Sequence, residues 1–238
     1  MNYHAIAAIW AFLLCLQIMS AQQAELTRFS FTVYGLRPGD YSNIYYEDAR
    51  GEPAELKFHR KRRSQAYEAE ILTKTPALKF LSKTTDSINN EVRGYRELST
   101  VQLTQDPDKL LFVFVPQKNP DNVGSFRILP VEDTVSPSER GTVRIINLTG
   151  LTLFGMVDDE RFELPSLSCS QTFRTVKTGQ SDFSIIAEGS SRFHLVYRNS
   201  FSIDSESSAL LFLTPPYRRV SLKLGGHMLY EELSGDAD

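Results

Sequence analysis

The alternation of apolar and polar residues constrains the fold of this chain more than any other feature of its sequence. In residues 28–33, polar side chains separate Phe29, Phe31 and Val33, so the apolar groups share one face of an extended strand. Similar segments follow as far as residue 224, rich in β-branched and aromatic residues and bounded by Gly, Pro, Asn and Asp. This pattern predicts an all-β protein.

The expected strands are short and evenly spaced. Turn residues at 35–40 favour a hairpin between a first strand at 28–33 and a second at 41–47. The run 110–115 is apolar at every position, which is typical of a central strand covered on both faces. A short helix within 77–99 is an alternative to strands there. The remaining strands are expected at 54–59, 67–72, 78–83, 95–103, 126–131, 142–148, 151–157, 161–164, 172–176, 183–187, 193–197, 201–203, 210–213 and 220–224.

Regular spacing of short strands predicts two β-sandwich-like domains, either immunoglobulin-like or small barrels. Pro116 and Pro120 interrupt the pattern between them, so we expect the domain boundary there. The N-terminal β domain then covers residues 25–117 and the C-terminal β-sandwich domain covers 124–233. The tail 234–238 is small and acidic and is expected to be flexible.

The N-terminal segment has the features of a secretory signal peptide. Residues 5–16 are all apolar, and small residues follow at Ser20, Ala21 and Ala24, any of which can precede the cleavage site. We take residues 1–21 as the signal peptide. A buried core helix or an uncleaved anchor is the alternative. No later segment reaches the roughly 18 apolar residues of a membrane-spanning helix, so we expect an exported, periplasmic or extracellular protein with no integral membrane span after signal removal.

The cysteine content argues against a structural disulfide, and the charge argues against a nucleic-acid partner. Cys15 lies in the export segment, so Cys169 has no partner within the mature chain and no structural disulfide is expected. The formal net charge is −3, and neither half is strongly basic. Because non-specific attraction to DNA or RNA depends on clustered positive charge, we expect no nucleic-acid partner.

No arrangement of residues announces a catalytic or metal site. His59, His194 and His227 occur outside any metal-binding spacing, and the serines have no local companion base. Cys169 with His194 is a candidate nucleophile pair, but an inert cysteine is the favoured interpretation. Asp158-Asp-Glu160 is an acidic turn without the spacing of a calcium loop. We therefore assign no catalytic residue, no cofactor and no metal ligand.

Two groups of residues are candidates for binding a partner. Arg60, Lys61, Arg62 and Arg63 are consecutive cations that repel one another, so we expect them in a solvated turn. This turn either only solubilises the domain, which is the favoured interpretation, or contacts an anionic envelope polymer, lipid head groups or an acidic partner. Tyr45 and Tyr46 are adjacent in a strand and must point to opposite faces, so at most one belongs to the core. The other can stack on a sugar ring or cover a protein partner.

The second half resembles uncharacterised exported bacterial proteins made of two β-rich domains. The residues that carry this resemblance are Gly141-Thr-Val-Arg-Ile-Ile-Asn-Leu-Thr-Gly150, the Leu153-Phe-Gly segment and Arg161-Phe-Glu-Leu-Pro165. The resemblance implies export and two β domains, and it implies no activity. Asn147-Leu-Thr149 also matches the N-glycosylation acceptor pattern, which matters only in a eukaryotic secretory pathway.

These observations favour a non-enzymatic exported protein, a binding or interaction module of the periplasm or cell envelope. Its expected partner is an envelope protein or polysaccharide, and a chaperone-like role by strand addition is a close relative of this hypothesis. One alternative is a hydrolase of envelope sugars or esters with dispersed acid and base residues, which requires a cleft uniting two carboxylates or a Ser with His194. A carbohydrate-binding module is another, and it requires several tyrosines on one exposed face.

Overall fold

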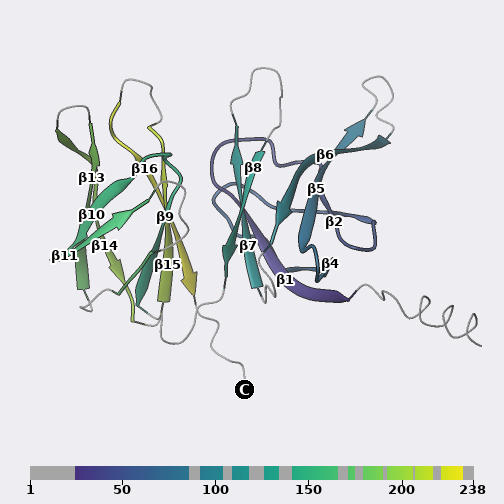
Figure 1. The fold of residues 1–238 in the computed structure, drawn as a ribbon, viewed down its shortest axis with the longest axis horizontal. Coiled ribbons are helices and arrows are strands. Elements are labelled where there is room, and N and C mark those ends of the chain that lie inside the picture. The colour runs from purple at the N-terminus through teal and green to yellow at the C-terminus, as the bar shows by residue number, and fades with distance from the viewer. Residues whose placement is uncertain are drawn as a thin grey trace, which may run out of the picture. The chain divides into compact units, whose positions relative to one another are not determined.

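The described part of the chain consists of strands, turns and loops, and it contains no helix. The computed structural model describes residues 25–85, 92–103, 109–117, 126–133, 141–165, 171–174, 179–189, 192–205, 207–216 and 221–232. The expected all-β class is confirmed. Contacts divide the chain into two compact units between Asp133 and Thr134 (Figure 1). We call these unit 1 and unit 2.

Unit 1 is a β-sandwich of two four-stranded sheets, with strand orders β4-β1-β7-β8 and β3-β2-β5-β6. All neighbours are antiparallel except β1 and β7, which are parallel. The strands are β1 (Leu26–Gly35), β2 (Ile44–Glu47), β3 (Pro53–Glu55), β4 (Tyr67–Leu72), β5 (Ala77–Thr85), β6 (Val92–Gln102), β7 (Lys109–Pro116) and β8 (Phe126–Glu132).

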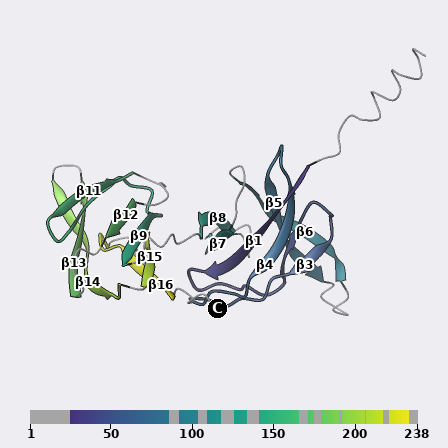
Figure 2. The same cartoon turned by 90° about the horizontal axis from the view of Figure 1, so that it is seen from below.

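Unit 2 is a second sandwich, with strand orders β12-β9-β15-β16 and β11-β10-β13-β14. Figure 2 shows these two sheets as separate layers. The strands are β9 (Thr142–Asn147), β10 (Leu153–Val157), β11 (Glu160–Leu164), β12 (Gln171–Arg174), β13 (Gly179–Glu188), β14 (Phe193–Ile203), β15 (Ser207–Thr214) and β16 (Gly225–Glu232).

The side chains that alternate inward from the two sheets form the core of each unit. In unit 1, Phe31, Phe80, Phe112 and Phe114 are fully buried, and their rings meet at centroid distances of 5.0–5.3 Å, mostly edge to face. Such contacts between aromatic rings add to the stabilisation from burial itself. Unit 2 uses smaller side chains around Phe183. Alternation in the sequence therefore identifies both cores.

The two units have the same topology. In one sheet of each unit, the first strand pairs with the fourth and, in parallel, with the seventh, and the seventh also pairs with the eighth. In the other sheet, the fifth strand lies between the second and the sixth. Both sixth strands also carry an extra residue at the corresponding place: Leu98 in β6 and Val196 in β14. A β-bulge at one position is a specific feature of a fold. The two units are thus versions of one eight-stranded sandwich.

The structure places the boundary between the units later than the sequence analysis did. The expected break was at residues 117–124, which assigned the segment 126–131 to the C-terminal domain. Instead, β8 pairs with β7 along its length, from Leu110 opposite Glu132 to Pro116 opposite Phe126. Pro116 is thus the last residue of a paired strand and not part of a linker between domains.

Three local expectations are wrong. The first two strands do not form a hairpin, because β1 and β2 lie in different sheets. The described residues 221–224 form no strand, and the last strand among the described residues is β16, which follows them. The segments 193–197 and 201–203 belong to one continuous strand, β14. Alternation shows which face a side chain takes but does not identify the strand's partner.

The export segment 1–21 and the tail 234–238 lie outside the described residues, as does Cys169. Among the residues that the structure does describe, no helix has the length and apolar character needed to cross a membrane.

In unit 2, a buried asparagine holds the place where the chain crosses from one sheet to the other after its first strand. This residue is Asn147, which is fully buried. Its amide nitrogen donates to the carbonyl oxygens of Leu151, Leu164 and Pro165 at 2.7–3.1 Å, and its amide oxygen accepts from Thr149. In this structure Asn147 acts as a buried structural clamp that joins β9, the following turn and the end of β11.

We expect Asn147→Ala to lower the free energy of unfolding by about 3 kcal/mol, because three carbonyl oxygens at the crossing lose their donor. Urea unfolding followed by circular dichroism measures this change. Asn199→Ala is the matched control, since Asn199 is exposed on β14, and it should change stability by less than about 0.5 kcal/mol. Equal effects of the two substitutions would contradict the assigned role.

A charged cluster links the two sheets of unit 1. Glu70 on β4 accepts hydrogen bonds from Arg28 on β1 at 2.9 Å and from Arg50, in the β2–β3 turn, at 2.6 and 2.9 Å. Hydrogen bonds from Arg50 and Arg28 lower the pKa of Glu70 from 4.5 to about 2. The β2–β3 turn of one sheet is thereby tied to β4 of the other.

The lowered pKa predicts how unit 1 responds to acid. A carboxyl whose pKa is lower in the folded state stabilises the fold above its unfolded pKa, and this contribution disappears as the pH falls from about 4.5 towards 2. We expect the urea midpoint to fall over this range, and to fall less steeply in Glu70→Gln. Glu68→Gln is the control, because the Glu68 side chain is 72% exposed and lies 3.9 Å from Arg28. Parallel profiles for wild type and Glu70→Gln would refute the linkage.

Candidate functional site

The first four residues of the basic turn, residues 59–63, are exposed to solvent, as the sequence analysis expected. His59, Arg60, Lys61 and Arg62 are exposed. The backbone nitrogen of Lys61 donates to the carbonyl of Gly35 at 2.8 Å, and Lys61 has a positive φ of 59°. The turn is therefore fixed against the end of β1, with its first cations directed to solvent.

Arg63 differs from the other cations of this turn, and the expectation that all four are solvated is wrong for it. Its guanidinium group is within 2.5 Å of both carboxylate oxygens of Asp133, whose side chain is only 2% exposed. Thr32 donates to the same carboxylate at 3.3 Å. Arg63 therefore neutralises a buried charge inside unit 1 and serves the fold.

Tyr45 and Tyr46 point to opposite faces of β2, as expected. Tyr46 is 8% exposed and belongs to the core, where its ring meets Phe31 edge to face at 5.0 Å. Tyr45 is on the outer face of the sheet, the face turned away from the core of its own unit. There its ring lies 5.0 Å from that of Tyr95, which is 44% exposed. Only Tyr45 of the two candidates is therefore available to a partner.

The histidines are dispersed within the described residues. His59 belongs to the basic turn, His227 to β16, and His194 lies on the face of β14 opposite to Phe193 and Leu195. Among the side chains that the structure describes, no group of three His, Cys, Asp or Glu residues is arranged to hold a metal ion.

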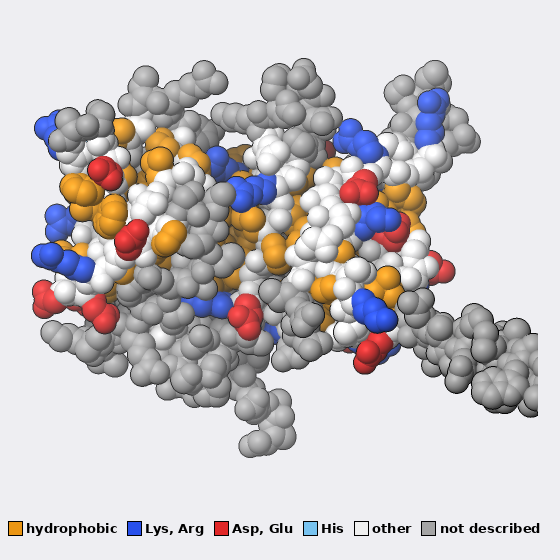
Figure 3. Space-filling view, viewed as in Figure 1, with side chains coloured by type: hydrophobic (Ala, Val, Ile, Leu, Met, Phe, Trp, Pro, Cys, Tyr) orange, Lys and Arg blue, Asp and Glu red, His pale blue; other side chains and the backbone are white. Residues whose placement is uncertain are grey.

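An exposed apolar surface lies on unit 2, and the sequence analysis did not single it out. It lies on the outer face of the sheet β11-β10-β13-β14. Phe193 and Leu195 are 55% and 56% exposed, and Met156 is 40% exposed. Figure 3 shows hydrophobic side chains gathered over this part of the molecule. We define the apolar face by five residues: Phe154, Met156, Ile186, Phe193 and Leu195.

Strand register brings these five side chains together. Phe154 is opposite Ile186, which is opposite Leu195 in turn, so three neighbouring strands contribute one row. The rings of Phe154 and Phe193 meet edge to face at a centroid distance of 5.7 Å. Met156 lies two residues after Phe154 on β10, so it is on the same face in the next row of side chains. The sequence does carry a signal of this surface. In β10, β13 and β14, the outward-facing positions between the core residues include apolar side chains.

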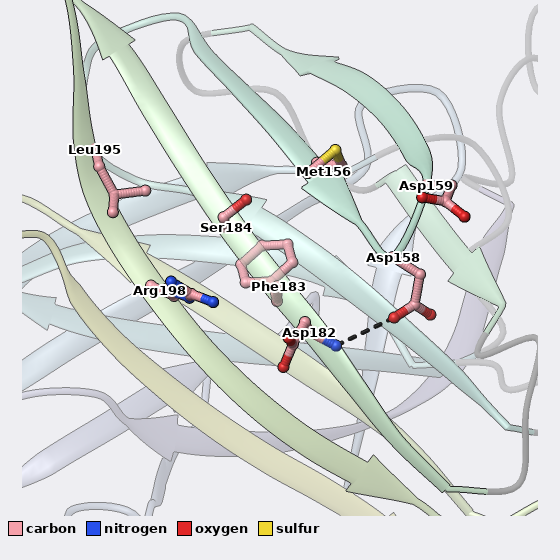
Figure 4. A pocket seen from close by; sticks show the side chains of 8 residues that line it. All are labelled: Met156, Asp158, Asp159, Asp182, Phe183, Ser184, Leu195 and Arg198. Atoms are coloured by element: carbon pink, nitrogen blue, oxygen red, sulfur yellow. Dashed lines mark hydrogen bonds between the residues drawn. The ribbon is translucent and has the colours of Figure 1, made fainter.

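The apolar face continues into an acidic end. A depression of about 860 Å³ is lined by Met156 and Leu195 and also by Asp158, Asp159 and Asp182 (Figure 4). An adjoining depression of about 710 Å³ shares Met156 and is lined mainly by apolar groups. The surface thus changes from apolar to negatively charged along one sheet.

The acidic end brings together carboxylates that are separate in the sequence. Such an arrangement is what the hydrolase alternative requires. Asp158 accepts a hydrogen bond from the backbone nitrogen of Asp182 at 3.2 Å, and Asp182 accepts one from Ser200 at 2.6 Å. Both aspartates and Asp159 are exposed to solvent. A general acid in a glycosidase is instead a carboxyl group removed from water. The arrangement suits electrostatic attraction better than acid catalysis.

Comparison with known proteins yields no family. No protein-family model matches the chain, and no curated protein matches it. Among solved structures, the chain is similar to CBMbc, a family 26 carbohydrate-binding module of Eubacterium rectale Amy13K, solved in complex with maltoheptaose. The identity is 11%, the match covers 88% of this chain and 99% of that one, and the TM-score is 0.22. A similarity at this TM-score supports no inference about function.

We expect Arg63→Ala to lower the free energy of unfolding by about 3 kcal/mol, because it leaves the Asp133 carboxylate buried without its cation. Arg62→Ala is the matched control, as it removes an exposed cation from the same turn and should cost less than about 0.5 kcal/mol. Chemical denaturation of both variants provides the comparison. If Arg62→Ala were equally destabilising, the separation of the turn into solvated and structural cations would be incorrect.

Proposed function

We propose that this chain is a non-enzymatic binding protein that holds a polypeptide partner on the apolar face of unit 2. The observation that carries the proposal is the exposure of Phe193, Leu195 and Met156 side by side on one sheet. Large apolar patches on soluble proteins mark interaction sites, because their exposure to water is unfavourable. The N-terminal segment supports a place of action outside the cytoplasm.

The chemistry of the face favours a polypeptide. Its centre consists of Met156, Ile186 and Leu195 together with two phenylalanines, and none of these side chains forms strong hydrogen bonds. Polar side chains such as Glu163 and Ser184 lie only at the edge of this centre, so sugar hydroxyls placed over the centre itself would lose their water without replacement. Interface cores between proteins are enriched in aromatic residues and Met and have a polar rim. The partner is therefore expected to contribute apolar side chains.

The acidic end sets the charge of the partner. Asp158, Asp159 and Asp182 line one depression with a single cation, Arg198. An acidic surface attracts a basic ligand and speeds its association. We expect the bound segment to carry Lys or Arg beside its apolar residues, and its association rate to fall as the salt concentration rises.

The test begins with crosslinking in the source cells. A photo-reactive amino acid is placed at Leu195 of the full chain and, as the matched control, at Tyr230, which is 56% exposed on β16 in the other sheet. One reproducible protein joined at Leu195 and absent at Tyr230 is the expected result. Absence of any crosslink specific to Leu195 would overturn the proposal.

Calorimetry with the captured protein then measures affinity. Phe193→Ser should weaken binding at least about tenfold, because exposed aromatic anchors dominate the energy of such interfaces. Tyr230→Ser should leave the affinity within about twofold of wild type. Since both residues are exposed, neither substitution should change the unfolding midpoint. Equal affinities of wild type and Phe193→Ser would argue against this face as the site.

A further inference from the structure

Unit 1 carries an aromatic pair at the position equivalent to that of Phe154 and Phe193. In β2, Tyr45 is opposite Leu81 of β5, next to the point where the bulge in β6 shifts the register. In β10, Phe154 is opposite Ile186 of β13, next to the equivalent bulge in β14. On the sixth strands, Leu81 is opposite Glu97 and Ile186 is opposite Leu195. Two residues before each of these lies an aromatic residue, Tyr95 in unit 1 and Phe193 in unit 2. Both pairs pack at a steep angle, with interplanar angles of 69° and 89°.

The residues around the two pairs differ in character. The positions of Met156 and Leu195 in unit 2 are occupied by Glu47 and Glu97 in unit 1. Lys79 stands opposite Glu47 and donates to its carboxylate at 2.5 Å. At these two positions, unit 2 places apolar side chains beside its exposed aromatic pair, whereas unit 1 places two carboxylates, one of them paired with an ammonium group.

The tyrosine pair leaves an aromatic ring accessible. Leu81, opposite Tyr45, points away from the core yet is only 4% exposed, so side chains on the outer face cover it. Tyr95 remains 44% exposed above this layer. Next to it, Thr100 donates a hydrogen bond to one oxygen of Glu97 at 2.9 Å, which orients the carboxylate. An aromatic ring beside an oriented acceptor is available to a ligand.

We propose that the outer face of the sheet β3-β2-β5-β6 is a saccharide-binding site centred on Tyr45 and Tyr95. The C–H groups on one side of a pyranose ring carry partial positive charge and pack on the negative face of an aromatic ring. Sugar hydroxyls donate to carboxylates, and hydrogen bonds to charged acceptors are the stronger ones. Glu97 and Glu47 supply these acceptors. The phenylalanine pair of unit 2 also has carboxylates beside it, Glu163 opposite Phe154 and Glu188 opposite Phe193. There, however, apolar side chains occupy the positions of Glu47 and Glu97.

The site is independent of the polypeptide site proposed on unit 2. If both hold, the protein joins a polypeptide to a glycan through two versions of one surface. The two proposals can therefore fail separately, and the variants below distinguish them.

The test uses the full chain and three neutral hexasaccharides: an α-1,4-glucan, a β-1,4-glucan and a β-1,4-linked N-acetylglucosamine oligomer. Isothermal titration calorimetry should detect binding of at least one of them. Tyr95→Ala should weaken that binding at least about tenfold, whereas Tyr95→Phe retains the ring and should stay within about threefold of wild type. Glu97→Gln should weaken it, because a neutral amide is a poorer acceptor.

Phe193→Ser is the matched control, since it removes the equivalent aromatic residue of unit 2 and should leave saccharide binding unchanged. Unfolding midpoints of all variants show whether each still folds. Failure of all three hexasaccharides to bind would overturn the proposal. Equal binding by wild type and a folded Tyr95→Ala would also overturn it, as would loss of binding in Phe193→Ser.

Discussion

The parallel pairing of the first and seventh strands is the contact on which each sandwich depends. In unit 1 it joins Phe31 to Leu110 and Val33 to Phe112, and in unit 2 it joins Ile145 to Leu211. These strands occupy the centre of their sheet, and the other two strands of the sheet flank them. Each unit must therefore bring together residues from its beginning and its end, which is a slow kind of contact to form.

The sequence predicts the strands well because burial acts on each side chain locally. Alternation at Phe29, Phe31 and Val33 shows which side chains face a core, and the structure buries all three. Partners are a different matter. The turn residues after Gly35 suited a hairpin, but Leu36 instead donates to the carbonyl of Phe114 in β7. Pairing depends on residues distant in the chain, which local patterns do not encode.

The candidate sites show the same limit. Arg63 is indistinguishable in the sequence from Arg62, and only the fold brings it to Asp133. Tyr45 and Tyr46 were separable, because adjacent strand residues must face opposite ways. The apolar face of unit 2 was missed since Phe154 and Phe193 come from strands that are far apart in the sequence. A surface assembled across strands becomes visible only when the register is known.

The bulges at Leu98 and Val196 have a consequence for the behaviour of the protein in concentrated solution. Both occur in edge strands of 11 residues, whose unpaired backbone groups offer a template for the strands of another molecule. A bulge bends and twists the edge, so a straight incoming strand cannot extend the sheet along it. Both sandwiches thus expose an aromatic pair beside an edge strand whose shape disfavours pairing with another molecule.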